Sequence, residues 1–270
     1  MKKKTQRNRQ RRKARENIKR LGGAISHITH TEIDDIRDEW EGVHYKWWIF
    51  TLSGVLLFFF LSYCFYTKLG WVADQRSLPV GTDWLLRHLP VYNVLPVLSW
   101  GWFALHIYAA YVAIAYYPRR MPFLMFMLGV YICIRTLFIF LSPIGPPAGM
   151  VSMRDMDFIF SKIMGTYTFN NEFIFSGHMS IPFLFFLFFD TKLRRTVMMT
   201  GSLLMGACVL LSHNHYTVDV LAAYPVSYSI YALSEKVYYR LIQPLFKMPV
   251  PAKLREKLGR KKLQYELERQ

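Results

Sequence analysis

The feature that most constrains this chain is a run of twenty residues, 47–66, that contains no charged side chain. An α-helix rises about 1.5 Å per residue, so this run is long enough to cross the ~30 Å hydrocarbon core of a bilayer. The run lies well inside the chain, and no short apolar region with a small-residue cleavage site precedes it, which argues against a cleavable signal. It therefore predicts a first membrane-spanning helix.

Five more apolar segments follow this run. They cover residues 91–117, 123–141, 173–189, 196–211 and 218–233. With 53% hydrophobic residues the chain is too apolar for a disordered protein, and its three cysteines, each in a different segment, predict no disulfide. We therefore expect an all-α integral membrane protein with six transmembrane helices.

The formal net charge of +16 would ordinarily suggest a nucleic-acid partner, but its distribution does not. Residues 1–20 carry +10 and residues 247–270 carry +5, which leaves +1 for the body between them. Basic flanks of this kind are typical of the cytoplasmic side of a membrane, where they also attract anionic lipid. We expect membrane lipids rather than nucleic acid as partners, although an RNA-binding or sorting role for a tail stays open.

The chain divides into four predicted parts. These are a basic cytoplasmic tail (1–23), an interfacial amphipathic helix (24–46), a six-span catalytic membrane domain (47–240) and a basic cytoplasmic C-terminal tail (241–270). The helix is predicted because apolar residues recur every three to four positions from Ile25 to Trp47, with acidic residues between them.

Six spans would place both termini on one side of the membrane. The loops 118–121 and 190–195, which would face that side, are rich in Lys and Arg, whereas segments 67–90 and 142–172 carry mixed charge. By the positive-inside rule, both termini are cytoplasmic. The fourth and sixth spans would then begin on the exoplasmic side.

Polar residues at the ends of apolar spans are costly and therefore mark candidate sites. The fourth span opens on Ser176-Gly177-His178, and the sixth opens on a segment in which His215 and Asp219, four residues apart, would share a helical face. Arg135 would lie ~20 Å along the third span from its inner end. The predicted topology brings these groups to the depth of an outer-leaflet phosphate.

Such a set can cut and remake a phosphodiester with no metal or cofactor. Asp219 would hold one tautomer of His215, whose free nitrogen would attack phosphorus. His178 would protonate the departing alkoxide and later deprotonate an incoming hydroxyl. Arg135 and the backbone N–H groups at the start of the fourth span would compensate phosphoryl charge.

Each candidate also has a plainer interpretation. His178 alone is compatible with a capped helix start, and His215 with Asp219 is compatible with a surface pair or with two metal ligands. Arg135 is compatible with a structural charge paired with a backbone carbonyl or with Glu172. The two motifs and their shared membrane face together favour the catalytic interpretation.

The segments FIFSGH (173–178) and HYTVDV (215–220) resemble the paired motifs of the sphingomyelin synthase family, within the lipid phosphate phosphatase-like (PAP2) superfamily. Arg119-Arg120 with Tyr131 and Arg135 is similar to another motif of that family. The resemblance implies a PAP2-like bundle that transfers a phosphoalcohol headgroup from a glycerophospholipid to ceramide through a phosphohistidine. It implies a catalytic triad of His178, His215 and Asp219. The substrate-binding residues would be Tyr131, Arg135, Glu172 and Ser176.

The chain departs from the superfamily's other patterns in ways that bear on function. Position 209 is Val where the phosphatase branch has a phosphate-binding Arg, which weakens a plain phosphatase interpretation. A hydrolase that uses water as acceptor remains an alternative. So does a non-catalytic lipid-binding or scramblase-like protein that has kept the motifs.

The acidic position before the first motif yields a testable expectation. The family usually has Cys-Gly-Asp where this chain has Asn170-Asn171-Glu172. The extra methylene of Glu172 would extend the carboxylate into a headgroup pocket and disfavour trimethylammonium relative to a primary amine. We expect Glu172→Asp to shift headgroup preference toward choline, measured with a phospholipid panel; an unchanged preference would contradict this.

Overall fold

The computed structural model describes residues 32–41, 43–142, 144–152, 169 and 171–245. The predicted basic tail 1–23 lies outside the described residues. So do the first part of the predicted amphipathic segment and most of the predicted C-terminal tail.

Helices dominate the described part of the chain. The long ones are α2 (Tyr45–Asp74), α4 (Trp102–Tyr116), α5 (Met121–Leu141), α7 (Gly177–Phe188), α8 (Lys192–Leu211) and α9 (Thr217–Val237). Shorter elements are α3 (Trp84–His88), a π-helical turn before α4 (Val97–Gly101), a 3₁₀ turn (Pro118–Arg120), a π-helical turn after α9 (Tyr238–Ile242) and α10 (Gln243–Leu245). The described residues form no strand, only an isolated bridge between Val80 and Gly145.

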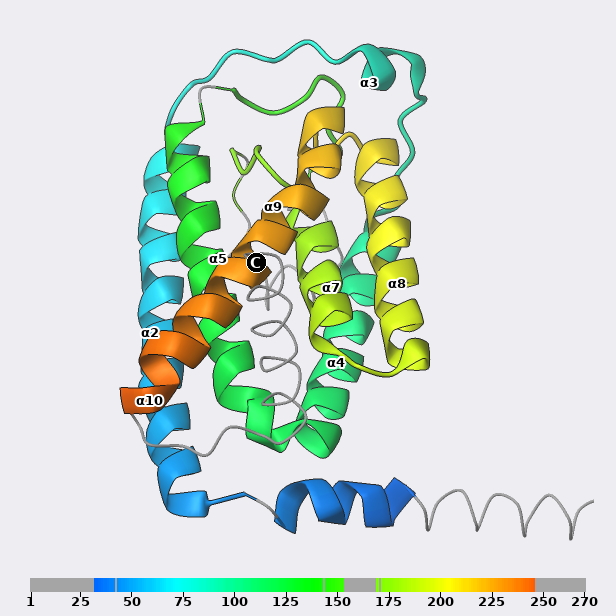
Figure 1. Ribbon diagram of the computed structural model, residues 1–270. Coiled ribbons are helices and arrows are strands. Elements are labelled where there is room, and N and C mark those ends of the chain that lie inside the picture. Colours follow the sequence, from blue (N-terminus) through cyan, green and yellow to red (C-terminus); the bar gives the residue numbers. More distant parts are fainter. Residues whose placement is uncertain (1–31, 42, 143, 153–168, 170, 246–270) are drawn as a thin grey trace, which may run out of the picture.

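The helices pack as a bundle in which α9 joins two groups (Figure 1). On one side α2 packs along α5, and on the other α7 packs against α8 and both contact α4. Helix α9 contacts both α7 and α5 and crosses the bundle obliquely. Because α9 begins beside α7, the two motif-bearing helices start at the same end of the molecule.

Within the residues that the structure describes, four helices are long and apolar enough to cross a membrane: 48–74, 97–116, 118–141 and 192–211. The fourth predicted span is the shorter apolar helix α7, with 12 residues, and the sixth corresponds to α9, which is not among the four. The described part of the chain is therefore helical and contains four candidate spans. The count of six stays a prediction.

Many large apolar side chains face outward while several hydroxyl groups are buried inside, as expected of a bundle surrounded by lipid. On α2, Phe50, Leu57 and Phe60 are each about 60% exposed. By contrast, Ser202 on α8 is fully buried and donates to the carbonyl of Met179 at 2.9 Å. This hydrogen bond joins α7 to α8 without exposing polar atoms.

Three predicted boundaries were wrong. Helix α2 continues eight residues past position 66, and the second helical segment begins at Val97 rather than at 91. The fourth begins at Gly177 rather than at Phe173, because Ser176 is in an extended conformation and its N–H donates across to the Asp219 carbonyl. Apolar composition alone does not distinguish these buried loop residues from helix.

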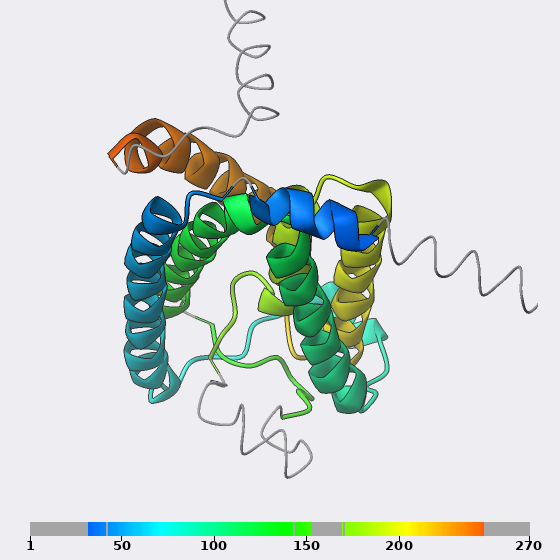
Figure 2. The same ribbon diagram turned by 90° about the horizontal axis from the view of Figure 1, so that it is seen from below.

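Residues 32–41 form a helix that runs across one end of the bundle (Figure 2). The indole of Trp40 donates to the carbonyl of Ile114 at 3.2 Å, and that of Trp48 donates to the carbonyl of Pro118 at 2.6 Å. Arg119 donates to the Asp38 carbonyl at 3.1 Å. The bonds of Trp40 and Arg119 attach the helix to α4 and to the 3₁₀ turn before α5, and the bond of Trp48 attaches the start of α2 to the same turn. The cytoplasmic, interfacial location of the helix stays a prediction.

Asp83 ties the segment after α2 to the start of α9. Its carboxylate accepts hydrogen bonds from the Leu86 amide (3.1 Å), the Thr217 amide (2.6 Å) and the Thr217 hydroxyl (2.9 Å). Burial opposes the charged form, but these donors outweigh it and hold the pKa of Asp83 below its usual value. Asp83 thus serves two helix N-termini, α3 and α9.

We expect Asp83→Ala to lower stability by about 1–2 kcal/mol at neutral pH, the usual cost of a lost N-cap. Since the folded pKa is depressed, the stabilisation is present above the unfolded value near pH ~4 and disappears as pH falls through the lower folded value. Thermal unfolding of parent and variant in detergent from pH 3 to 7 measures this. A stability difference that grows on acidification would contradict it.

Candidate active site

The centre of the site is a buried pair at the start of α9. His215 Nδ1 lies 3.3 Å from Asp219 Oδ2, and the two residues are only 5% and 3% exposed. The same carboxylate oxygen accepts from the Tyr216 amide at 3.1 Å. Asp219 therefore caps α9 and orients His215 at once, and the Nε2 edge of the imidazole is left free of this contact.

The pairing was predicted, but the reason given for it was wrong. Helix α9 begins only at Thr217, so His215 lies in the preceding turn and does not share a helical face with Asp219. The contact arises because Asp219, in the first turn, folds back toward the backbone that precedes the helix. This is helix-capping geometry.

The Ser176-Gly177-His178 motif lies against the motif that contains His215 and Asp219. The Ser176 amide donates to the Asp219 carbonyl at 3.3 Å, which joins the segment before α7 to the first turn of α9. His178 is the second residue of α7 and lies within electrostatic range of His215 and Arg135. Its ring lies 5.9 Å, centroid to centroid, from that of Trp102 on α4.

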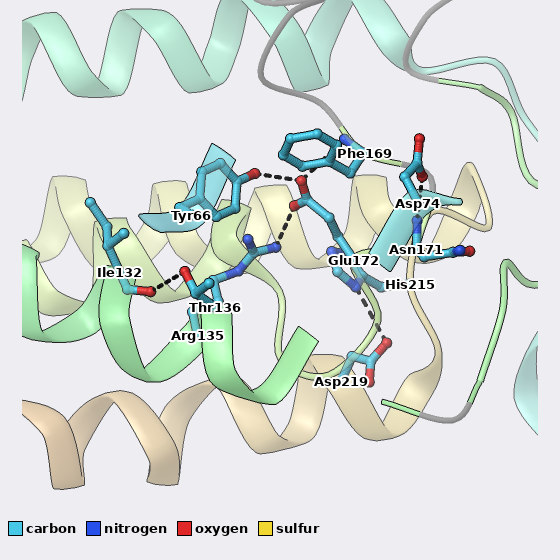
Figure 3. A network of polar contacts seen from close by, with 10 residues as sticks. All are labelled: Tyr66, Asp74, Ile132, Arg135, Thr136, Phe169, Asn171, Glu172, His215 and Asp219. Carbon is cyan, nitrogen blue, oxygen red and sulfur yellow. Dashed lines mark hydrogen bonds and ion pairs between the residues drawn. The ribbon is translucent and has the colours of Figure 1, made fainter. Parts of the chain in front are cut away.

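Arg135 is brought to this site by an ion pair with Glu172 (Figure 3). Their closest atoms are 2.8 Å apart, and the side chains are 11% and 17% exposed. The other Glu172 oxygen accepts from the Tyr66 hydroxyl and, at 3.1 Å, from the Phe169 amide. The plainer interpretation of Arg135, a charge paired with Glu172, therefore describes a contact that the structure contains.

The loop that carries Glu172 is anchored to the end of α2. The Asn171 amide group donates to the carbonyls of Ala73 (2.9 Å) and Arg76 (3.0 Å), and its backbone N–H donates to Asp74 (3.2 Å). Glu172 is thus held between α2 and α5, both of which supply it with a partner.

Several buried polar atoms beside Arg135 lack partners within the described part of the chain. They are Arg135 Nε, the Tyr131 hydroxyl and the hydroxyls of Ser176 and Ser180. The Tyr131 and Ser180 hydroxyls are near each other, yet neither makes a hydrogen bond of good geometry. Arg135 lies close to the start of α7, where a Cβ built on Gly177 would be 3.5 Å from its Nε. Unpartnered donors of this kind suit a group with several acceptor oxygens.

The Arg119-Arg120 motif and His213, which lies two residues before His215, have positions or contacts outside this site. Arg120 lies at the opposite end of α5, paired with Asp190 at 3.1 Å, so the Arg119-Arg120 pair does not join the site. His213 adopts a positive φ of 52°, and its ring contacts the carbonyls of Ala148 and Leu89. Among the described residues, no group of three or more His, Cys, Asp or Glu side chains is placed to hold a metal ion.

Sequence reasoning missed Tyr66 and Trp102. Tyr66 supplies a hydrogen bond to Glu172, and Trp102 packs its ring near His178. The chain has 17 tyrosines and 7 tryptophans, many of them in apolar runs, and no spacing rule distinguishes these two. Only the packing of α2 and α4 against the later helices identifies them.

Residues 171–236 match the family model described as PAP2 superfamily C-terminal. The match supports the PAP2 superfamily. It covers both motifs, from Asn171 through α7 and α8 into α9, and it suggests lipid chemistry of phosphatase or phosphotransferase type. No curated protein and no solved structure matches the chain.

The ion pair predicts a coupled effect on stability. Arg135→Met leaves the Glu172 carboxylate unpaired in a largely buried position, and we expect a loss of ~3 kcal/mol. The double variant Arg135→Met/Glu172→Gln removes both charges and should recover most of that loss. Thermal unfolding of the parent, both single variants and the double variant measures the coupling; strictly additive losses would contradict it.

Proposed function

We propose that this protein is a phosphotransferase of sphingomyelin synthase type. It would move a phosphoalcohol headgroup from a glycerophospholipid to the primary hydroxyl of ceramide. The observation that carries the proposal is the buried His215–Asp219 pair, held against the start of α7 by the hydrogen bond from Ser176 to Asp219. The PAP2 superfamily match over the same residues supports it.

In the first half-reaction, His215 is the nucleophile. Asp219 accepts from Nδ1–H, so the lone pair of Nε2 attacks phosphorus, and the phosphorus–oxygen bond to diacylglycerol breaks. His178 donates the proton that converts the departing alkoxide to the diacylglycerol hydroxyl. Arg135 and the buried hydroxyls beside it bind the phosphoryl oxygens, whose charge is distributed differently in the transition state.

In the second half-reaction, the phosphohistidine transfers its group. His178, now neutral, accepts the proton of the ceramide hydroxyl as its oxygen attacks phosphorus. The bond from phosphorus to Nε2 breaks and its electron pair returns to Nε2, which leaves neutral His215 with its Nδ1–H still donated to Asp219. The products are a phosphosphingolipid and diacylglycerol, and the enzyme is back in its starting protonation state, because His178 regains from ceramide the proton that it gave to diacylglycerol.

The sidedness of the site is part of the proposal. With both termini cytoplasmic, the starts of α7 and α9 lie on the exoplasmic side, whether lumenal, extracellular or periplasmic. The basic segments 118–121 and 190–195, at the other end of the bundle, support this orientation.

Hydrolysis is the second candidate, because the PAP2 match also covers phosphatase-type chemistry. In that reaction water replaces ceramide at the second step. The two functions are distinguished by incubating the purified protein in liposomes with a panel of phospholipids, with and without ceramide, and identifying products by mass spectrometry. A phosphosphingolipid that forms only with ceramide supports transfer; diacylglycerol released equally without ceramide supports hydrolysis.

The roles of the individual residues predict distinct losses of activity. We expect His215→Ala to abolish product formation and Asp219→Asn or His178→Ala to lower kcat by at least ~100-fold, the usual scale of acid–base assistance. With a phosphorus-32 headgroup donor, the parent should acquire an acid-labile label that His215→Ala lacks.

His88→Ala is the matched control, since His88 is exposed on α3 and, among the described residues, its ring lies against the carbonyl and ring of Trp84, away from the site. It should retain the parent activity. Full activity in His215→Ala would exclude the phosphohistidine route, and an inactive parent would favour a non-catalytic lipid-binding protein.

A further inference from the structure

A hollow on the surface lies at the opposite end of the bundle from His178 and His215. Its volume is about 450 Å³, within the usual range for small-molecule sites. Residues that line it are Phe186, Lys192, Arg195, Thr196, Met199 and Thr200. The hollow lies along the first nine residues of α8, and about 17 Å of helix separate Thr200 from Leu211, which precedes the segment that carries His215.

The hollow carries uncompensated positive charge. Its acid, Asp190, binds Arg120 through both carboxylate oxygens, at 3.1 and 3.2 Å. Within the described residues, neither Lys192 nor Arg195 pairs with a carboxylate. Two cations that have no carboxylate partner in the described part of the chain, and two threonines, therefore line one space, which is the donor set of a phosphate site.

Arg195 is held in place by stacking and not by an acid. Its guanidinium carbon lies 4.3 Å from the centre of the Phe186 ring. A cation over an aromatic face keeps its N–H edge available for a ligand. The neighbouring Arg194 differs, because it stacks on Tyr116 at 3.7 Å and also donates to the Tyr117 hydroxyl at 3.3 Å.

Beyond the charged end of the hollow, Met199 and Leu203 form an apolar track along the same face of α8. Positions 192, 195, 196, 199, 200 and 203 follow the three-to-four spacing of a single helical face. Met199 lines the hollow, and Leu203, one turn further toward the middle of the helix, is 56% exposed. A ligand with a charged head at Lys192 would therefore have an exposed apolar surface beside its tail.

We propose that this hollow binds the headgroup of an anionic phospholipid in the leaflet opposite the catalytic histidines. Lys192 and Arg195 contact the phosphate, Thr196 and Thr200 donate to its oxygens, and an acyl chain lies along Met199 and Leu203. Free phosphate would use the cations but not the apolar track. The proposal does not depend on the function proposed above, because none of these residues belongs to that site.

Native mass spectrometry of the full chain, stripped of lipid in detergent, tests the proposal. The parent protein is titrated with dioleoylphosphatidylglycerol and, separately, with dioleoylphosphatidylcholine. The affinity of its tightest binding site is measured for each lipid. We expect the glycerol lipid to bind more tightly, and Lys192→Gln/Arg195→Gln to weaken its binding roughly 30-fold, since each base near the membrane surface contributes about 1 kcal/mol.

Two matched variants distinguish lipid binding at this hollow from nonspecific attraction of the lipid by the positive charge of the protein. Lys68→Gln/Arg87→Gln removes the same charge from exposed positions on α2 and α3 and should bind like the parent. Lys192→Arg/Arg195→Lys keeps the charge and should retain most of the affinity, which distinguishes a binding defect from misfolding.

A further arm distinguishes lipid from free phosphate. Leu203→Gln should weaken binding of the dioleoyl lipid but not of its dihexanoyl analogue, and 10 mM inorganic phosphate should not displace the dioleoyl lipid. Displacement by inorganic phosphate would overturn the proposal in favour of a free-anion site. Equal affinity of the parent and the Lys192→Gln/Arg195→Gln variant for phosphatidylglycerol would also overturn it.

Discussion

The candidate site depends on one buried carboxylate, that of Asp219. Inside an apolar bundle an ionised group must be fully paired, because the cost of leaving it unsolvated is several kcal/mol. Asp219 meets this requirement through His215 and the Tyr216 amide, and its own carbonyl accepts from Ser176. One residue thus caps α9, orients an imidazole and fastens the start of α7 to the start of α9.

The ion pair of Arg135 and Glu172 extends the same principle to the other half of the bundle. The carboxylate receives donors from α2 and α5, while Asn171 beside it is held by carbonyls at the end of α2. The loop before α7 is therefore fixed between two helix pairs, and with it Arg135 and the buried hydroxyls beside it. Burial of charge thereby links the positions of α2, α5, α7 and α9.

The two ends of the bundle handle cations differently. Near the histidines, Arg135 is paired with an acid and lies beside unpartnered hydroxyls. At the other end, Arg194 and Arg195 stack on aromatic rings, and Arg120 both stacks on Phe188 at 4.4 Å and pairs with Asp190. Stacking satisfies the face of a guanidinium and leaves its edge available, which suits a membrane surface rich in phosphate.

The sequence by itself determined the helical class, the approximate places of six apolar segments, the two tails of positive charge and the pairing of His215 with Asp219. These follow from hydropathy, charge and local spacing, which act over a few residues. Only the tertiary structure decided that α7 begins at Gly177, that Arg135 pairs with Glu172 rather than with a backbone carbonyl, and that Tyr66 joins them. Each of these depends on a donor or acceptor from a distant part of the chain, and no local pattern of residues identifies such a partner before the helices pack.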